Sequence, residues 1–150
     1  AGGAARSIAD ALLQNGCSLV YVANRTVQKA RDIAALQPDI IQPVAWEDVE
    51  TITGVVDLLV NTTSLGMVGR QPLLLPLDNT RSDCVVSDIV YEPLETDLLA
   101  QARQLGRPVL DGLGMLLHQA VPGFQLWFGI RPQVTDELRA LVEQDLLSHG

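Results

Sequence analysis

The spacing of short apolar runs constrains the fold of this chain more than any other feature of the sequence. Residues 19–23, 55–60 and 84–90 are mostly apolar, which is typical of strands buried on both faces of a parallel sheet. Between these runs lie segments whose apolar residues recur at helical spacing. The alternation of such strands with amphipathic helices predicts an α/β fold, with a doubly wound parallel sheet built from βαβ units.

The same patterns predict the remaining elements. Residues 40–44 are an expected edge strand, because Pro43 limits its pairing, and residues 108–110 are a short strand. Residues 68–83 are the least structured stretch, and we expect them to form a surface loop. Thr96 is a plausible N-cap, and Gly106 a plausible stop, for one of the helices. Helices are expected over residues 7–14, 27–36, 46–51, 96–105, 114–128 and 135–147.

Composition excludes several classes of function. The chain has 150 residues, of which 47% are hydrophobic, and this favours a single globular domain over residues 1–150. Eighteen acidic residues face ten basic ones, which argues against a nucleic-acid or anionic-membrane partner. No apolar run reaches the roughly 18 residues of a membrane span and no signal peptide is recognisable, so we expect a cytoplasmic protein. Cys17 and Cys84 lack metal-ligand spacing, and we predict no metal site.

Small residues open the chain and begin its first helix. In a dinucleotide-binding fold, the second glycine of the phosphate loop lets the backbone approach the pyrophosphate, and a later small residue lets the helix pack closely on the sheet. Gly2 and Ala5 fit these two roles. The first glycine of that pattern and the strand before it would lie upstream of Ala1, so we expect a Rossmann-like sheet with C-terminal helices that lacks its first strand.

The next strand ends in the segment Asn24, Arg25 and Thr26. An NAD-binding site usually has an acidic residue here to hold the adenosine ribose, about 20 residues beyond the phosphate loop. This chain has Arg25 there instead, and its guanidinium can bind a 2′-phosphate. Lys29, the only lysine of the chain, lies about one helical turn further on. The pattern therefore favours NADP over NAD as the cofactor.

Five motifs together resemble the shikimate dehydrogenase family. Their order and spacing match the family over essentially the whole chain. They are the phosphate loop Ala1-Gly2-Gly3-Ala4, the adenosine motif Asn24-Arg25-Thr26, the loop from Asn61 to Met67, the segment from Asp88 to Thr96, and the helix from Gly112 to Ala120.

The resemblance implies roles for particular residues. Ile89 and Gly112 would line the nicotinamide end of the cofactor, and Tyr91 and Gln119 would contact the substrate. The amide of Gln119 could donate to and accept from the hydroxyls of a polyol, although a glutamine on a helix surface is the ordinary alternative. Thr63 and Ser64 follow an apolar strand, where such loops approach the cofactor ribose, and simple loop capping is their alternative. The predicted cofactor site thus comprises Ala1, Gly2, Gly3, Ala4, Asn24, Arg25, Thr26, Lys29, Thr63, Ser64, Ile89 and Gly112.

The activity implied by the resemblance is the NADPH-dependent reduction of 3-dehydroshikimate to shikimate, in the biosynthesis of chorismate and aromatic amino acids. Family members carry the catalytic lysine and aspartate in a separate N-terminal domain, so we expect this chain to be the NADP-binding part of a two-domain enzyme, with no catalytic residue of its own. A quinate/shikimate dehydrogenase and a non-catalytic nucleotide-binding fragment remain as alternatives. We interpret His118 as a structural or surface residue, and Met67, Met115, Trp127 and Phe128 as packing residues.

Overall fold

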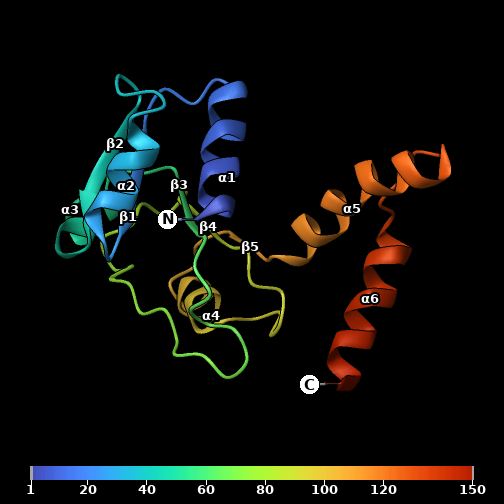
Figure 1. The fold of residues 1–150 in the computed structure, drawn as a ribbon. Coiled ribbons are helices and arrows are strands. Elements are labelled where there is room, and N and C mark those ends of the chain that lie inside the picture. Colours follow the sequence, from blue (N-terminus) through green and yellow to red (C-terminus); the bar gives the residue numbers. More distant parts are fainter. Residues whose placement is uncertain (1, 150) are drawn as a thin grey trace. The chain divides into compact units, whose positions relative to one another are not determined.

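The computed structural model describes residues 2–149 (Figure 1). The chain forms two compact units. The first contains the chain up to Asp57 together with Pro76–Arg81, and the second contains Leu58–Leu75 and the chain from Ser82 onward. Each unit has its own parallel sheet.

The first unit is a βαβ arrangement preceded by a helix. Strands β1 and β2 pair in parallel from Val20 opposite Ile41 to Asn24 opposite Ala45. Because β1 is the only strand paired with β2 among the described residues, β2 is an edge strand as the sequence predicts. The elements in order are α1 (Gly3–Gln14), β1 (Val20–Asn24), α2 (Val27–Ala34), β2 (Ile41–Ala45), the 3-10 helix η1 (Trp46–Asp48) and α3 (Val49–Thr53).

The core of the first unit lies where α1 and α2 meet the strands. Small residues at this contact let the helices approach closely. In α1 these are Ala5 and Ala9, which are buried in the same cluster as Val20 and Val22 of β1. The close packing predicted for Ala5 is therefore confirmed. The rest of the cluster comes from α2 and β2: Ala30, Ile33, Ala34 and Ile41.

The second unit has β4 at the centre of a three-stranded parallel sheet of order β3-β4-β5. Leu58 to Asn61 of β3 lie opposite Val85 to Asp88 of β4. Helix α4 packs against β4, and its Leu98, Leu99 and Ala102 are almost completely buried. The elements are β3 (Leu58–Asn61), β4 (Val85–Asp88), α4 (Asp97–Gln104), β5 (Val109–Leu110), α5 (Leu113–Phe128) and α6 (Asp136–His149).

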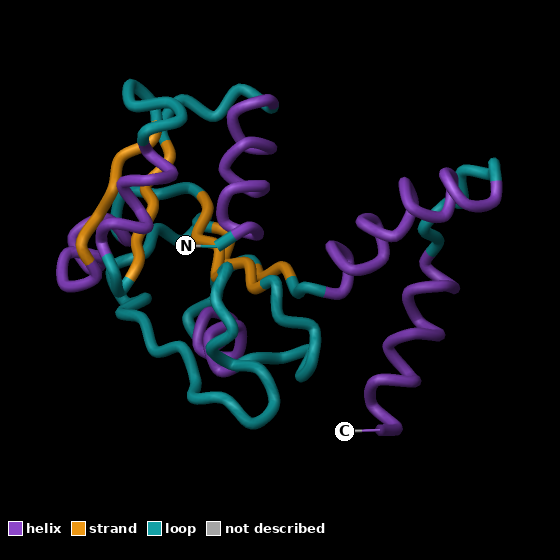
Figure 2. Tube along the Cα trace, in the orientation of Figure 1, coloured by secondary structure: helices purple, strands orange, loops and turns teal. Residues whose placement is uncertain are grey.

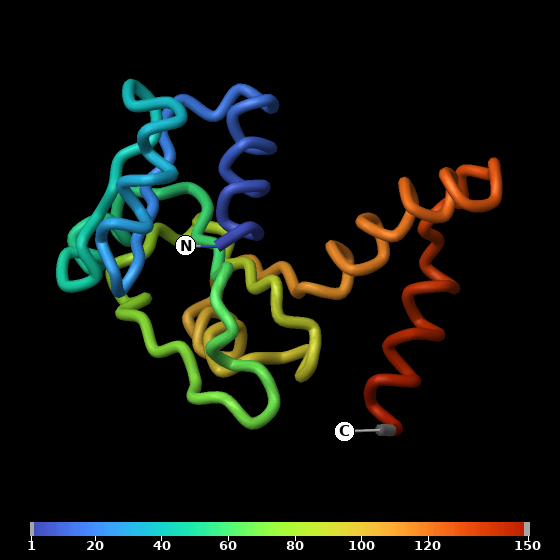
Figure 3. Tube along the Cα trace, viewed as in Figure 1, coloured from blue at the N-terminus to red at the C-terminus, as the bar shows by residue number. Residues whose placement is uncertain are grey.

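The ends of the helices follow the predicted caps. Thr96 precedes α4, and its hydroxyl accepts a hydrogen bond from the Leu99 N–H at 3.4 Å. Gly106 follows α4 with a φ of 71°, a left-handed conformation that glycine adopts without steric cost. Helix α5 continues through Pro122 and is followed by Gly129, which also has a positive φ. Figures 2 and 3 show α5 and α6 as successive helices joined by a short loop.

An ion pair connects α6 with the segment just before α5. The guanidinium of Arg139 donates to the carboxylate of Asp111 and also lies 3.7 Å from Glu143. The hydrogen bond to Asp111 raises the pKa of Arg139 above its ordinary value. Among the described helices none combines the length and the apolarity that crossing a membrane requires.

Two expectations about local structure need correction. The strand expected from residue 55 begins only at Leu58, because the Val55 N–H bonds to Ile52 in a last helical turn and leaves this side chain 63% exposed. The loop over residues 68–83 lacks regular structure as predicted, but it is not wholly on the surface, since Leu73 and Leu77 are buried.

The predicted fold class is confirmed, because the paired strands of each sheet run parallel and helices connect β1 to β2 and β4 to β5. No described strand joins β1 to β3.

Candidate functional site

The N-terminus of α1 is open around its glycines. Gly2 is the N-cap, and no side chain caps the helix. A Cβ atom added to Gly2 or Gly3 would meet no atom within 4 Å. The first N–H groups of a helix have no intrahelical partner, and they are positioned to receive an anion. Gly2, Gly3 and Ala4 are all exposed here, whereas Ala1 lies outside the described residues.

The segment between β1 and α2 presents exposed cations. Arg25 and Lys29 are both exposed, and neither forms an ion pair with another described residue. The Asn24 side chain donates to the Thr26 carbonyl at 2.9 Å, which turns the chain into α2. The first turn of α2 contains no acidic residue. Because a cation near a helix N-terminus is unfavourable by itself, the arrangement suits an added anion.

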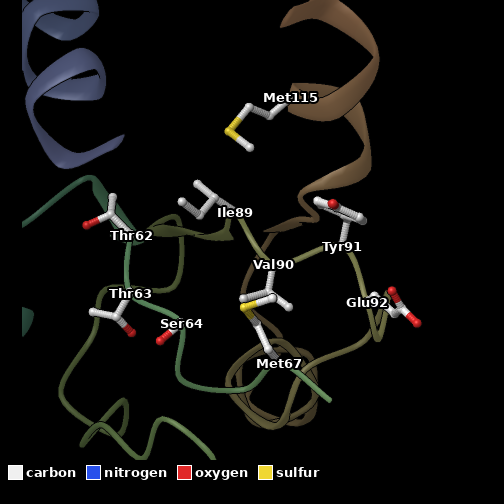
Figure 4. Close-up of a pocket in the computed structure, with 9 residues that line it drawn as sticks. All are labelled: Thr62, Thr63, Ser64, Met67, Ile89, Val90, Tyr91, Glu92 and Met115. Atoms are coloured by element: carbon white, nitrogen blue, oxygen red, sulfur yellow. The ribbon is translucent and has the colours of Figure 1, made fainter. Parts of the chain in front are cut away.

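A pocket of about 340 Å³ opens in the second unit, where the chain leaves β3 and β4. Four of its lining residues come from the loop after β3 and four from the segment after β4, while Met115 on α5 points toward Ile89 (Figure 4). Predominantly apolar walls with a few hydroxyls are typical of small-molecule sites. The pocket is lined by Thr62, Thr63, Ser64, Met67, Ile89, Val90, Tyr91, Glu92 and Met115.

Gly112 lets the start of α5 approach the end of β4. A Cβ atom at position 112 would lie 2.3 Å from the carbonyl oxygen of Ile89 and 2.5 Å from that of Val90. Both are backbone atoms, so a side chain at this position would displace the main chain. The Gly112 N–H also donates to the Val90 carbonyl at 3.3 Å. Gly112 therefore sets how closely α5 approaches the pocket.

Of the two residues expected to contact substrate, one lines the pocket and the other does not. Tyr91 lines the pocket, whereas Gln119 is exposed on α5 and is not among the lining residues. Met115 and Gln119 are four residues apart in one helix, so they share a face. Gln119 thus continues the wall that Met115 begins, one helical turn further along α5.

Sequence reasoning missed part of the pocket. Met67 and Met115 are not packing residues, since they line the pocket and are 44% and 36% exposed. Trp127 and Phe128 are not packed within the described chain either, with 81% and 61% of their surface exposed. The four-residue spacing between Met115 and Gln119 was a usable signal for Met115, and the same loops that supplied Ser64 and Ile89 also supply Thr62, Val90 and Glu92.

Known protein families match two parts of the chain. Residues 1–72 match the family model of shikimate / quinate 5-dehydrogenases, and residues 112–143 match the model of the shikimate 5′-dehydrogenase C-terminal domain. A shikimate dehydrogenase (NADP(+)) of Rhodopseudomonas palustris strain BisB5 is 52% identical over 150 residues, which are 100% of this chain and 53% of that protein. The chain belongs to the shikimate dehydrogenase family.

Other members of the shikimate dehydrogenase family resemble the chain to a similar degree. The enzyme of Nitrobacter winogradskyi is 54% identical over 147 residues, covering 98% of this chain and 53% of that protein. The chain therefore spans about half the length of the curated relatives it matches. Gly2, Arg25, Lys29 and Ser64 lie within one family match and Gln119 within the other.

Solved structures of shikimate dehydrogenase relatives share the fold. Quinate dehydrogenase from Corynebacterium glutamicum in complex with NAD has a TM-score of 0.83 at 31% identity, over 99% of this chain and 52% of that one. Shikimate 5-dehydrogenase from Thermus thermophilus in complex with NADP(H) and shikimate has a TM-score of 0.77 at 32% identity, over 98% of this chain and 52% of that one.

Proposed function

We propose that this chain is the NADP(H)-binding part of a shikimate dehydrogenase, which reduces 3-dehydroshikimate to shikimate. The observation that carries the cofactor assignment is the pair of exposed cations, Arg25 and Lys29, which have no ion-pair partner among the described residues. Two cations facing a dianionic 2′-phosphate favour NADP, and a guanidinium can bind a phosphate through two parallel hydrogen bonds.

The residues present fit such a cofactor. The space above Gly2 and Gly3 is open to a pyrophosphate at the start of α1. Arg25 and Lys29 would hold the 2′-phosphate, with Asn24 and Thr26 shaping the turn between them. Thr63 and Ser64 would contact the ribose, and Ile89 with Gly112 would border the ring. When bound, the nicotinamide supplies the hydride for carbonyl reduction.

The side chains of this chain would then orient the substrate. Tyr91, on the pocket wall, and Gln119, one turn beyond Met115, offer a phenol and an amide to the hydroxyls of a polyol. Reduction also needs a group that delivers a proton to the developing alkoxide. We assign that group to the part of the enzyme that the curated relatives have and this chain does not span.

Calorimetric titration of NADP and NAD into the full-length protein tests the cofactor assignment. Charge-assisted contacts are each worth about 1.5–3 kcal/mol, so we expect at least about tenfold tighter binding of NADP. Equal affinities would contradict the assignment.

A quinate-using enzyme is the second candidate, favoured by the similarity to quinate dehydrogenase from Corynebacterium glutamicum, a complex with NAD. Rates with shikimate and quinate, each measured with both cofactors, separate the two. Preference for quinate with NAD would replace the first proposal by the second.

A further inference from the structure

A buried carboxylate lies behind the pocket wall. Asp88 is the last residue of β4, and its surface is 0% exposed. Its Oδ1 atom accepts hydrogen bonds from the Asn61 side-chain amide at 2.9 Å and from the Val90 N–H at 3.0 Å. Its Oδ2 atom accepts from the Thr96 hydroxyl at 2.8 Å. One side chain thus connects β3, the segment after β4, and the start of α4.

Asn61 extends this network into the other wall of the pocket. Its Oδ1 atom accepts from both the N–H and the hydroxyl of Thr63, at 2.9 and 2.8 Å. Its amide nitrogen donates to the Leu65 carbonyl at 3.1 Å as well as to Asp88. All four hydrogen-bonding positions of the amide are therefore used, and they fix the orientation of Asn61 and the turn that presents Thr63.

The chemistry of these neighbours calls for a carboxylate at position 88. The Asn61 oxygen is occupied by Thr63, so its NH2 group must face Asp88. The Val90 N–H can only donate. The Thr96 hydroxyl already accepts from Leu99, so it too donates to Asp88. A carboxylate accepts at both oxygens, whereas an amide would place an N–H group against one of the donors.

Two of the residues that this network holds line the pocket. Thr63 comes from the turn held by Asn61, and Val90 is bonded directly to Asp88. A further bond from the Val68 N–H to the Glu92 carbonyl, at 3.2 Å, connects the same two segments. Gly66 lies beside the network, and a Cβ atom there would be 3.4 Å from the Cβ of Thr96. Asp88 itself does not line the pocket.

We propose that Asp88 is a positioning residue of the pocket, acting through Asn61 and Val90. Its hydrogen bonds fix the position of the loop that carries Thr63 relative to the segment that carries Ile89 and Tyr91. The proposal rests on the proposed function, because the pocket is taken to receive the reacting end of the cofactor. Misplacing reacting groups by about 1 Å can cost about 10²-fold in rate, so the network acts on kcat. The affinity for NADP is assigned mainly to Arg25 and Lys29 of the first unit and should change little.

The first test is Asp88→Asn in the full-length protein. We expect kcat to fall by at least about tenfold, while the NADP dissociation constant stays within about twofold, measured well below the unfolding temperature. Thr53→Val is the matched control. It removes another buried hydroxyl, which donates to Glu50 within the first unit, and it should lower stability without changing kcat. An unchanged kcat in folded Asp88→Asn overturns the proposal.

A second pair of variants covers the case in which Asp88→Asn does not fold. Thr96→Val removes the hydroxyl that donates to Asp88, and Thr96→Ser restores one. We expect kcat to fall in the valine variant and to recover most of its value in the serine variant. Equal kcat values for the two variants would overturn the proposal.

Hydrogen exchange supplies a readout that needs no cofactor. In the unliganded protein, Asp88→Asn should increase exchange at the Val90 and Thr63 amides together, because one network holds both. If Val90 alone exchanged faster, Asp88 would not couple the two walls. A wild-type protein that bound no NADP would refute the proposed function, yet this exchange experiment would still decide the role of Asp88.

Discussion

The region around Arg25 in the first unit and the pocket around Ile89 in the second unit differ in whether their polar side chains are exposed. Arg25 and Lys29 are exposed side chains with no ion pair among the described residues. In the second unit, Asn61, Asp88 and Thr96 lie behind the pocket, where they are buried and joined by hydrogen bonds. In the proposed function, the first region selects an anion by charge, and the second holds the shape of the pocket. Substitutions should therefore affect binding in the first region and folding or positioning in the second.

The largest expected effect concerns catalysis, because neither region supplies the proposed proton-delivering group. General acid catalysis typically contributes about 10²–10⁴-fold, and no lysine is among the residues that line the described pocket, since Lys29, the only lysine of the chain, lies on α2. We predict that residues 1–150 alone show no NADP⁺ reduction with saturating shikimate at alkaline pH, followed by NADPH absorbance. Turnover close to that of the full-length protein would place the catalytic groups in this chain.

The next effect concerns stability in the second region. Gly112→Ala places a Cβ atom 2.3 Å from a backbone oxygen, and forcing such a contact should lower the free energy of unfolding by about 3 kcal/mol or more. Gly123→Ala in the same helix meets nothing within 4 Å and should be neutral or stabilising by up to about 1 kcal/mol. Urea unfolding of both variants measures the contrast. Similar stabilities would mean that α5 does not approach β4 as described.

Substitutions in the first region should behave in the opposite way. Arg25→Gln and Lys29→Gln should each weaken NADP binding about tenfold or more, with the free energy of unfolding unchanged within about 0.5 kcal/mol. Arg31→Gln, an exposed cation on α2, is the control for net charge. If all three variants weakened NADP binding equally, the loss of affinity would come from general electrostatic attraction and not from a specific phosphate site.

The smallest expected effect separates substrate from cofactor contacts. Gln119→Ala removes an exposed amide from α5. Loss of one hydrogen bond is worth about 0.5–1.5 kcal/mol, so the KM for shikimate should rise roughly two- to tenfold while NADP affinity stays constant. A parallel loss of NADP affinity would make Gln119 a cofactor or folding residue.

The two regions also differ in how well the sequence predicts them. Arg25 and Lys29 are neighbours along one turn of chain, so local spacing alone indicates a shared anion site. The pairing of Asn61 with Asp88 spans 27 residues, and it depends on the register of β3 against β4, which local patterns do not contain. The apolarity of Trp127 and Phe128 predicts packing, but their exposure depends on which surfaces the chain itself covers.

Strand boundaries show the same limit. Val55 has the apolarity of a strand residue, but the helical turn of α3 persists to Gly54 and delays β3 to Leu58. Apolar character predicts that a strand lies here, whereas its start is decided by a backbone hydrogen bond from Val55 to Ile52. Residues 1–72 and 112–143 match family models, while Ile89 and Tyr91 fall between those matches.

The clearance at Gly112 has a consequence for thermal motion in the pocket. With 2.3 Å between the Ile89 oxygen and the position of an absent Cβ, the start of α5 and the end of β4 have little room to slide past each other. The backbone then behaves as a fixed frame, and changes in the width of the opening fall to side-chain rotation. The two lining thioethers, Met67 and Met115, have unbranched and flexible side chains suited to this. The opening should adapt to a ligand by rotamer exchange on the nanosecond scale rather than by slower displacement of a helix.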